Sequence, residues 1–209
     1  MKILLVDDHA IVRRGMRELL GEAFDAAQFE EAGTGEDALG YVNRATFDLV
    51  VLDLSMPGRG GLDALKQFRA ASPKLPVLVL SQHAEEQYAI RAFRAGASGY
   101  VTKDSAPDEL VSAARKALSG GMYVSSALAE HLAARLATDP DQRSEDALSD
   151  RELQVLRLLA NGKTVKEIGA ELALSEKTIS TYRTRILDKL NVKTNAELMR
   201  FALRSGLTD

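Results

Sequence analysis

Short apolar runs alternate with longer amphipathic stretches over residues 1–121 of the chain. The runs that predict strands are Ile3–Val6, Ala27–Glu31, Leu49–Leu52, Val77–Leu80 and Tyr100–Val101. Between them the apolar residues recur every three or four positions, for example from Leu62 through Leu65 to Phe68, which is the spacing of one helix face. Such alternation is typical of a parallel sheet covered by helices on both faces. The pattern therefore predicts an α/β domain with a doubly wound, five-stranded parallel sheet.

The pattern changes over residues 147–209, where the apolar positions have helical spacing throughout. Four helix starts are indicated by hydroxyl residues, three of them followed three positions later by glutamate: Ser149/Glu152, Thr164/Glu167, Thr194/Glu197 and, without the glutamate, Ser175. In such a capping box the hydroxyl accepts a free N–H of the first turn while the glutamate reaches back to the cap. We therefore expect an all-α domain of four helices that contains a helix-turn-helix.

The segment between these two domains, residues 122–146, reads as a linker. Leu128, Leu132 and Leu136 are spaced four apart within Ser125–Ala137, which predicts a possible short amphipathic helix. The following stretch, Thr138–Asp146, is polar, contains a proline and has no period, as is typical of connecting chain.

Composition and charge narrow the class of protein. The chain has no cysteine, which excludes disulfides and thiolate sites. Its N-terminal apolar run is too short for a signal peptide, and no run approaches the ~18 apolar residues of a membrane-spanning helix. We expect a soluble, cytoplasmic protein with no membrane partner. Residues 147–209 hold 11 Lys and Arg against 8 Asp and Glu, whereas residues 1–146 hold 16 against 22, which hints at an anionic partner for the helical domain.

Charged and hydroxyl residues stand where four of the predicted strands end. They are Asp7, Asp8, Asp53, Ser81 and Lys103. Each one alone could cap a helix or face water, but the carboxyl ends of parallel strands meet at one edge of the sheet. Clustered carboxylates repel one another and favour a hard cation such as Mg²⁺, and an aspartate beside such a cation can accept a phosphoryl group. The spacing therefore predicts a phosphoryl-transfer site at this edge.

The third helix of the helical domain has two distinct faces. With Ile179 toward the core, Ile186 and Leu190 fall on the same side. The opposite side collects short hydroxyl side chains among basic ones: Lys177, Ser180, Thr181, Thr184, Arg185 and Asp188. This face suits a helix in the DNA major groove, although the pattern alone fits a solvated face of a small bundle equally well.

Four motifs carry a resemblance to the receiver domain of two-component response regulators: VDDH (Val6–His9), VLDLSMPGRGG (Val51–Gly61), LSQH (Leu80–His83) and GYVTKD (Gly99–Asp104). The resemblance implies a flavodoxin-like fold over residues 1–121, with Asp53 as the phosphoacceptor. It implies Mg²⁺ as cofactor, held by Asp7, Asp8, Asp53 and the backbone carbonyl of Ser55, and a switch set of Ser81, Tyr100 and Lys103. Where the family often has a proline after the lysine, this chain has Asp104, which puts a cis peptide at that bond in doubt.

The helical domain, Leu148–Leu207, resembles the LuxR-type helix-turn-helix, and the whole chain is similar to NarL/FixJ-type response regulators. The implied function is a DNA-binding transcriptional regulator controlled by a partner histidine kinase, a homodimer when phosphorylated. The implied DNA contacts are Lys177, Ser180, Thr181, Tyr182, Arg183, Thr184 and Arg185. The fourth helix often supplies a dimer contact in this family, for which Leu198 and Ala202 are the candidates.

Two other functions remain open at this point. A phosphatase or phosphotransferase could use Asp53 as its nucleophile, but haloacid-dehalogenase-like enzymes have an acidic residue two positions on, where this chain has Ser55. The helical domain could instead bind protein, as an adaptor. We expect no enzymatic turnover beyond Mg²⁺-dependent self-phosphorylation and autodephosphorylation, and we assign neither His9 nor His83 a phosphorelay role.

Overall fold

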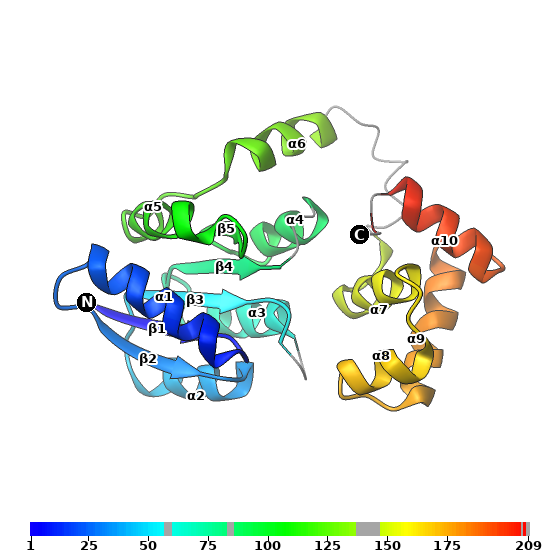
Figure 1. Cartoon of the computed structure of the whole chain (residues 1–209), viewed down its shortest axis with the longest axis horizontal. Coiled ribbons are helices and arrows are strands. Elements are labelled where there is room, and N and C mark those ends of the chain that lie inside the picture. Colours follow the sequence, from blue (N-terminus) through cyan, green and yellow to red (C-terminus); the bar gives the residue numbers. More distant parts are fainter. Residues whose placement is uncertain (57–59, 83–85, 137–146, 206, 208–209) are drawn as a thin grey trace. The chain divides into compact units, whose positions relative to one another are not determined.

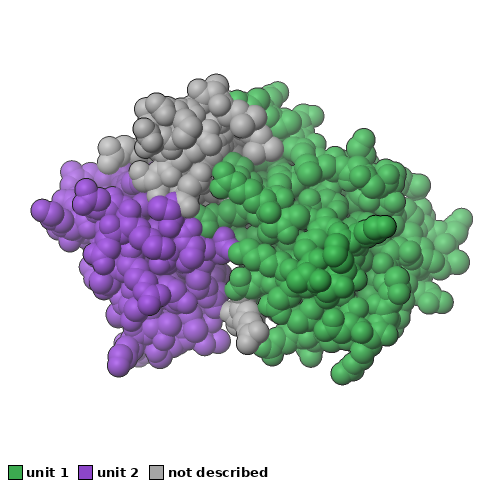
Figure 2. Space-filling view, turned by 180° about the vertical axis from the view of Figure 1, so that it is seen from behind, with its two compact units in different colours: residues 1–133 green, residues 134–209 purple. Residues whose placement is uncertain are grey.

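The computed structural model describes residues 1–56, 60–82, 86–136, 147–205 and 207 of the chain. These form two compact units, residues 1–133 and 134–209, coloured separately in Figure 2. His83 and the segment 138–146, predicted as connecting chain, lie outside the described residues. The described part contains no helix with both the length and the apolar character that a membrane span requires.

The first unit is built on a five-stranded parallel sheet. Its strands are β1 (Lys2–Val6), β2 (Gln28–Ala32), β3 (Leu49–Asp53), β4 (Val77–Ser81) and β5 (Gly99–Thr102), in the order β2-β1-β3-β4-β5. The helices between them are α1 (Ala10–Ala23), α2 (Gly35–Arg44), α3 (Gly61–Ala71), α4 (Glu86–Arg94) and α5 (Ala106–Leu118). As Figure 1 shows, α1 and α5 cover one face of the sheet and α2 and α3 the other. The predicted doubly wound fold is confirmed.

The core of this unit explains why its strands read as unbroken apolar runs. All five residues of β3 and of β4 are buried, because helices cover both faces of the sheet. On the α1 and α5 face, alternate strand residues such as Leu5, Val51 and Leu80 pack against Leu20 and Leu110. The helices thus hold the carboxyl ends of β1, β3 and β4 in fixed relative positions.

Several strands extend further than their apolar runs indicate. Asp53 and Ser81, predicted to follow their strands, are the last residues of β3 and β4, because the backbone ladder continues through the pairs Asp53↔Leu80 and Ser81↔Thr102. Ladder pairing uses main-chain groups, so polar side chains do not end it. The predicted strand at 27–31 was placed one residue too early: Ala26 has φ of 57° in the preceding turn, and pairing starts at Gln28.

The chain leaves α5 through a turn at Gly120, whose φ is 79°, and returns to the edge of β5. Tyr123 pairs with Gly99 there, donating its N–H to the carbonyl of Ser98 at 2.9 Å. A Cβ at position 99 would lie 3.0 Å from the Tyr123 Cβ, so glycine permits this close approach. The helix α6 (Ser126–Leu136) follows where a short helix was predicted.

After the end of α6, the described part of the second unit contains α7 (Asp150–Ala160), α8 (Val165–Glu171), α9 (Glu176–Lys189) and α10 (Asn195–Arg204). Its helices enclose a small apolar core to which α7, α8, α9 and α10 all contribute, through residues that include Leu153, Ile168, Ile179, Ile186 and Leu198. A Cβ on Gly169 would lie 2.8 Å from the Leu174 carbonyl oxygen. Glycine therefore allows the close approach of the chain in the turn between α8 and α9.

The helix caps follow the predicted pattern with one exception. Complete capping boxes start α7 at Ser149 and α8 at Thr164, and the Ser175 hydroxyl caps α9. At α10 the Thr194 hydroxyl caps the helix, but Glu197 accepts the N–H of Lys193 at 2.7 Å in place of the cap's own N–H. The cap φ is −130° there, against −66° and −75° at the complete boxes, and this different backbone accompanies the shifted contact.

Candidate functional site

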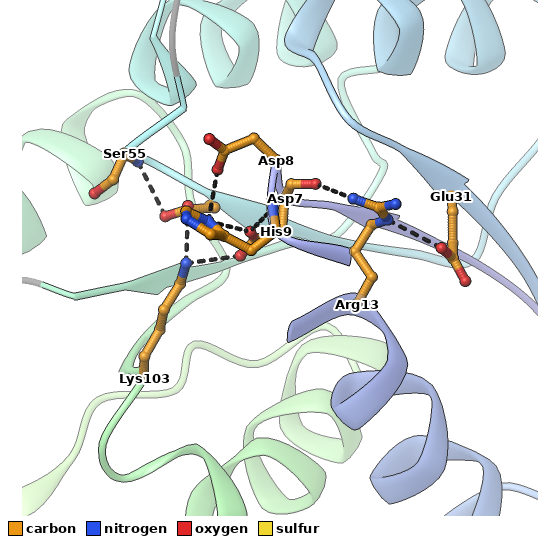
Figure 3. A network of polar contacts seen from close by, with 8 residues as sticks. Asp7, Asp8, His9, Arg13, Glu31, Ser55 and Lys103 are labelled. Carbon is orange, nitrogen blue, oxygen red and sulfur yellow. Dashed lines mark hydrogen bonds and ion pairs between the residues drawn. The ribbon is translucent and has the colours of Figure 1, made fainter. Parts of the chain in front are cut away.

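Three carboxylates meet at the carboxyl edge of the sheet, as the strand ends predicted. Asp7 and Asp8 follow β1 and Asp53 ends β3, and a ligand atom from each of them and from His9 lies within 4.8 Å of the others. Asp7 and Asp53 are buried, with exposed fractions of 0% and 1%, whereas Asp8 is exposed. Figure 3 shows Asp7, Asp8 and His9 close together, with the Lys103 side chain pointing toward them. The arrangement concentrates negative charge at the carboxyl edge of the sheet.

Lys103 balances the two buried carboxylates from the loop after β5. Its Nζ lies 2.7 Å from Asp7 Oδ2 and 2.9 Å from Asp53 Oδ2. Burial opposes the charged ammonium, but the contacts with Asp7 and Asp53 outweigh it, and the pKa of Lys103 is raised above its ordinary value. The ammonium therefore remains charged and tethers β1 and β3 together.

Asp53 is held at the end of β3 by the turn that follows. The Ser55 N–H donates to Asp53 Oδ1 at 3.0 Å, so each carboxylate oxygen has one donor. Burial raises the pKa of Asp53 above its ordinary value of 3.8, against the lowering effect of the Ser55 and Lys103 contacts. A Cβ on Gly61 would lie 2.2 Å from the Asp53 carbonyl oxygen, so α3 can approach this turn only with glycine at its first position.

The donor set fits a hard divalent cation. Carboxylate and carbonyl oxygens are the ligands that Mg²⁺ prefers. Asp7 Oδ2 is buried, and it forms an ion pair with the Lys103 ammonium but accepts no hydrogen bond of good geometry among the described residues. Removing a carboxylate from water costs free energy, and one ammonium shared by two carboxylates offsets only part of that cost. A divalent cation would offset more of it.

His9 was not predicted in this site, although it directly follows the two aspartates. Its Nδ1 lies 2.9 Å from Asp8 Oδ1 and 3.3 Å from Asp7 Oδ1, and its N–H donates to Asp7 Oδ1 at 2.8 Å. Its position directly before α1 could have predicted these contacts, because the turn into the helix places the His9 ring beside the two carboxylates that precede it. His9 and Mg²⁺ would compete for the same oxygens.

The three residues of the predicted switch set lie on β4, β5 and the loop that follows. Ser81 is 0% exposed at the end of β4, and its carbonyl accepts the Lys103 N–H at 2.7 Å. Tyr100 is 2% exposed on β5, on the opposite face of the sheet from Val101, which packs in the α1 and α5 cluster. The Lys103–Asp104 peptide is trans, consistent with the non-proline residue there.

The second unit presents the predicted DNA-contacting face on α9. Ile179 and Ile186 are buried, as expected, and most of the predicted contacts are exposed: Lys177, Ser180, Thr181, Thr184 and Arg185. The remaining two, Tyr182 and Arg183, are half-buried, and Arg183 Nε donates to Asn195 Oδ1 at 2.9 Å at the start of α10. The predicted dimer candidates Leu198 and Ala202 are buried, at 2% and 0% exposed, so they form part of this unit's own core.

The helix that bears this face is fastened to α7 by an ion pair. Lys189, the last residue of α9, places its Nζ 2.6 Å from Glu152 Oε2, and the same oxygen accepts the Ser149 N–H at 2.7 Å. Burial opposes the charged carboxylate, but these contacts dominate, and the pKa of Glu152 is lowered below its ordinary value of 4.5. One glutamate thus caps α7 and anchors α9.

We expect Glu152→Gln to destabilise the second unit near neutral pH by about 1 kcal/mol, a typical cost for a lost cap. Because the folded pKa is depressed, the contribution is present above pH 4.5 and lost as pH falls through the folded value. The difference between wild type and variant should therefore shrink in acid. Hydrogen–deuterium exchange of α7 and α9 peptides across this range measures it, with the exposed capping-box variant Glu167→Gln as control. A difference that grows in acid would contradict the assignment.

Comparison with known protein families covers almost the whole chain. Residues 3–115 match the family model of the response regulator receiver domain, and residues 146–202 match that of the bacterial regulatory proteins of the luxR family. The response regulator UvrY of Escherichia coli is 37% identical over 208 residues, which cover 99% of this chain and 95% of that protein. The response regulator GacA of Pseudomonas aeruginosa is 36% identical over 211 residues, which cover 100% of this chain and 98% of that protein.

Solved structures of response regulators also resemble this chain. RcsB of Salmonella enterica, bound to the rprA promoter in the presence of the phosphomimetic BeF3⁻, superposes with a TM-score of 0.66 at 30% identity, covering 96% of this chain and 97% of that chain. A LuxR-family response regulator from Aurantimonas superposes with a TM-score of 0.62 at 38% identity, covering 66% of this chain and 98% of that one.

Proposed function

Because this chain belongs to the response regulators with a LuxR-type DNA-binding domain, we propose that it regulates transcription under the control of phosphorylation at Asp53. The observation that carries the proposal is the bridge of Lys103 between Asp53 and Asp7. It brings the acceptor carboxylate, a second acid and a fixed ammonium together at one sheet edge. A histidine kinase is the partner that would supply the phosphoryl group. Both this transfer and DNA binding would take place in the cytoplasm.

The chemistry would run through one oxygen of Asp53. A bond forms between this oxygen and phosphorus while the phosphorus–nitrogen bond of the kinase phosphohistidine breaks, which leaves an acyl phosphate on the regulator. Asp8, Asp53 and the Ser55 carbonyl would hold Mg²⁺ directly and Asp7 would do so through water. When bound, the ion supplies positive charge that offsets the phosphoryl oxygens. The same site would hydrolyse the acyl phosphate slowly, as autodephosphorylation.

The switch would start from the contacts of Lys103. Phosphorylation adds about two negative charges at Asp53, together with new acceptor oxygens. Lys103 Nζ, now shared by two carboxylates, would turn to one of those oxygens, and the Ser81 hydroxyl would donate to another. Because β5 carries Tyr100 and pairs with β4 up to Ser81, movement at Ser81 would repack the face of α4, β5 and α5.

The output would be DNA binding through α9 as a homodimer. Its exposed hydroxyl and basic side chains have the mixture that reads base edges and positions phosphates. RcsB, which resembles this chain, has been solved in complex with DNA and as dimers on DNA. Because Leu198 and Ala202 are buried within the unit, a dimer contact on α10 would use its exposed residues, of which Met199 and Leu203 are apolar.

DNA selection from a random pool, with and without acetyl phosphate, tests this function. We expect enrichment of one symmetric motif, more strongly after phosphorylation, from the full-length protein with Mg²⁺ present. Enrichment of no sequence, with salt-insensitive retention of protein partners, would favour the adaptor alternative. Sustained turnover of a small phosphomonoester would favour the phosphatase alternative.

A further inference from the structure

The polar network in Figure 3 continues away from the acidic cluster to Arg13, on the first turns of α1. Its Nη1 donates to the backbone carbonyl of Asp7 at 2.7 Å, and its Nε donates to Glu31 Oε2 at 2.9 Å. The Arg13 side chain is 17% exposed, so these contacts are shielded from water. We propose that Arg13 is a positioning residue, which fixes the Asp7–Asp8 peptide so that both carboxylates present their oxygens to Mg²⁺. This inference rests on the proposed function.

The peptide between the two aspartates needs such a support. β1 ends at Val6, and the N–H of Asp7 makes the last contact toward β2, to the carbonyl of Ala32 at 3.2 Å. Among the described residues, the ladders of β1 with β2 and β3 extend no further than Val6. The direction of the Asp7 carbonyl sets the plane of the next peptide and therefore where Asp8 points. Arg13 is the side chain that holds this carbonyl.

The charge of Arg13 would oppose a nearby cation unless it were balanced. Glu31, on β2, supplies the balancing carboxylate, and its other oxygen pairs with Arg17, one turn further along α1. A planar guanidinium can bind a carbonyl and a carboxylate at once through different nitrogens, which a lysine ammonium cannot do with the same fixed geometry. Arg13 thus orients the peptide, while Glu31, which it shares with Arg17, offsets part of its charge.

The neighbouring residue offers a matched control. Arg14 lies on the same helix but is 77% exposed, and it pairs with Glu18 on that helix. Arg13→Ala and Arg14→Ala remove the same charge at nearly the same place, but Arg13→Ala alone also removes the contacts with Asp7 and Glu31. Groups that hold metal ligands in place typically contribute 10–100-fold to metal affinity, and we expect the lower end, about tenfold, for Arg13→Ala.

The experiment is a titration of the full-length protein with Mg²⁺, followed by the amide shifts of Asp8 and Ser55. Arg13→Ala should bind Mg²⁺ about tenfold more weakly than wild type and Arg14→Ala within about twofold. The Mg²⁺ concentration that gives half-maximal labelling by acetyl phosphate should rise by the same factor, while the rate at saturating Mg²⁺ recovers. Arg13→Met, which keeps an unbranched stem, decides the matter if Arg13→Ala does not fold.

The outcomes separate this inference from the proposed function. Mg²⁺ binding by wild type that is lost in Asp8→Asn but equal in Arg13→Met and Arg14→Ala overturns the role of Arg13 alone. Absence of Mg²⁺ binding by wild type overturns both. A weakened affinity in Arg13→Met, with unchanged thermal unfolding in the absence of Mg²⁺, supports the positioning role, because a purely structural residue would change the unfolding temperature as well.

Discussion

Asp53→Asn is expected to abolish covalent labelling by acetyl phosphate, whereas wild type should gain one phosphoryl group when Mg²⁺ is present and none when it is chelated. The reason is chemical, because an amide does not form an acyl phosphate and the substitution also removes one charged oxygen from the cation site. Asp53 is 1% exposed, and an asparagine of the same size keeps the shape of the position, while its NH2 group faces one of the two donors that now contact the carboxylate. Intact-mass spectrometry measures the adduct directly.

The control for this loss is the same substitution at an exposed aspartate of the same unit. Asp63, on the first turn of α3, faces solvent at 55% exposure and lies 3.9 Å from Lys66 on its own helix. Asp63→Asn should be labelled like wild type. An adduct of undiminished amount on Asp53→Asn would place the acceptor elsewhere and remove the basis for the proposed switch.

The acidic site was predictable because it depends on the sheet more than on side-chain detail. Parallel strands bring their carboxyl ends to one edge, so the positions of Asp7, Asp53 and Lys103 relative to their strands were enough to place them together. The comparisons confirm the family and the fold on which that reasoning depended. The roles of the individual residues stay predictions, which the Asp53→Asn and Arg13→Ala experiments address.

The contacts that the sequence did not predict depend on how elements approach one another. Arg13 reads as one more charged residue on a helix, and only the angle of α1 over β1 brings it to the Asp7 carbonyl. Gly61 likewise reads as part of a glycine-rich loop, yet the close passage of α3 over the Asp53 carbonyl makes it necessary. Such requirements come from tertiary packing, which local periodicity does not encode.

The same limit applies to α9. The 100° periodicity placed Ile179 and Ile186 in the core correctly, because burial follows the helix face. It could not show that Arg183 would be engaged by Asn195, since that contact depends on the turn between α9 and α10. The structure therefore separates Arg183 from Arg185, two residues that the family resemblance implied alike as DNA contacts.

We expect Thr184→Ala and Arg185→Ala to impair DNA binding in different ways. Thr184 is exposed, and its hydroxyl donates to the Ser180 carbonyl at 3.1 Å, which leaves its oxygen able to accept a hydrogen bond from a base edge. Its loss should cost about 1–3 kcal/mol on the selected site and relax preference at one or two base pairs. Arg185 has a long, exposed, charged side chain suited to phosphates, so its loss should weaken all sequences alike and reduce the salt slope by roughly one.

Binding titrations against the selected and a scrambled DNA, at several salt concentrations, separate these effects. Arg183→Ala tests the distinction drawn by the structure: because its guanidinium already binds Asn195, this variant should reduce the salt slope less than Arg185→Ala does. Lys193→Ala, an exposed lysine in the turn before α10, controls for the loss of one positive charge from the second unit and should leave base preference unchanged. If Thr184→Ala weakens both DNAs equally while Arg185→Ala changes base preference at constant salt slope, α9 is seated in the groove by a different face. The hydroxyl residues would then serve the backbone and the arginines the bases.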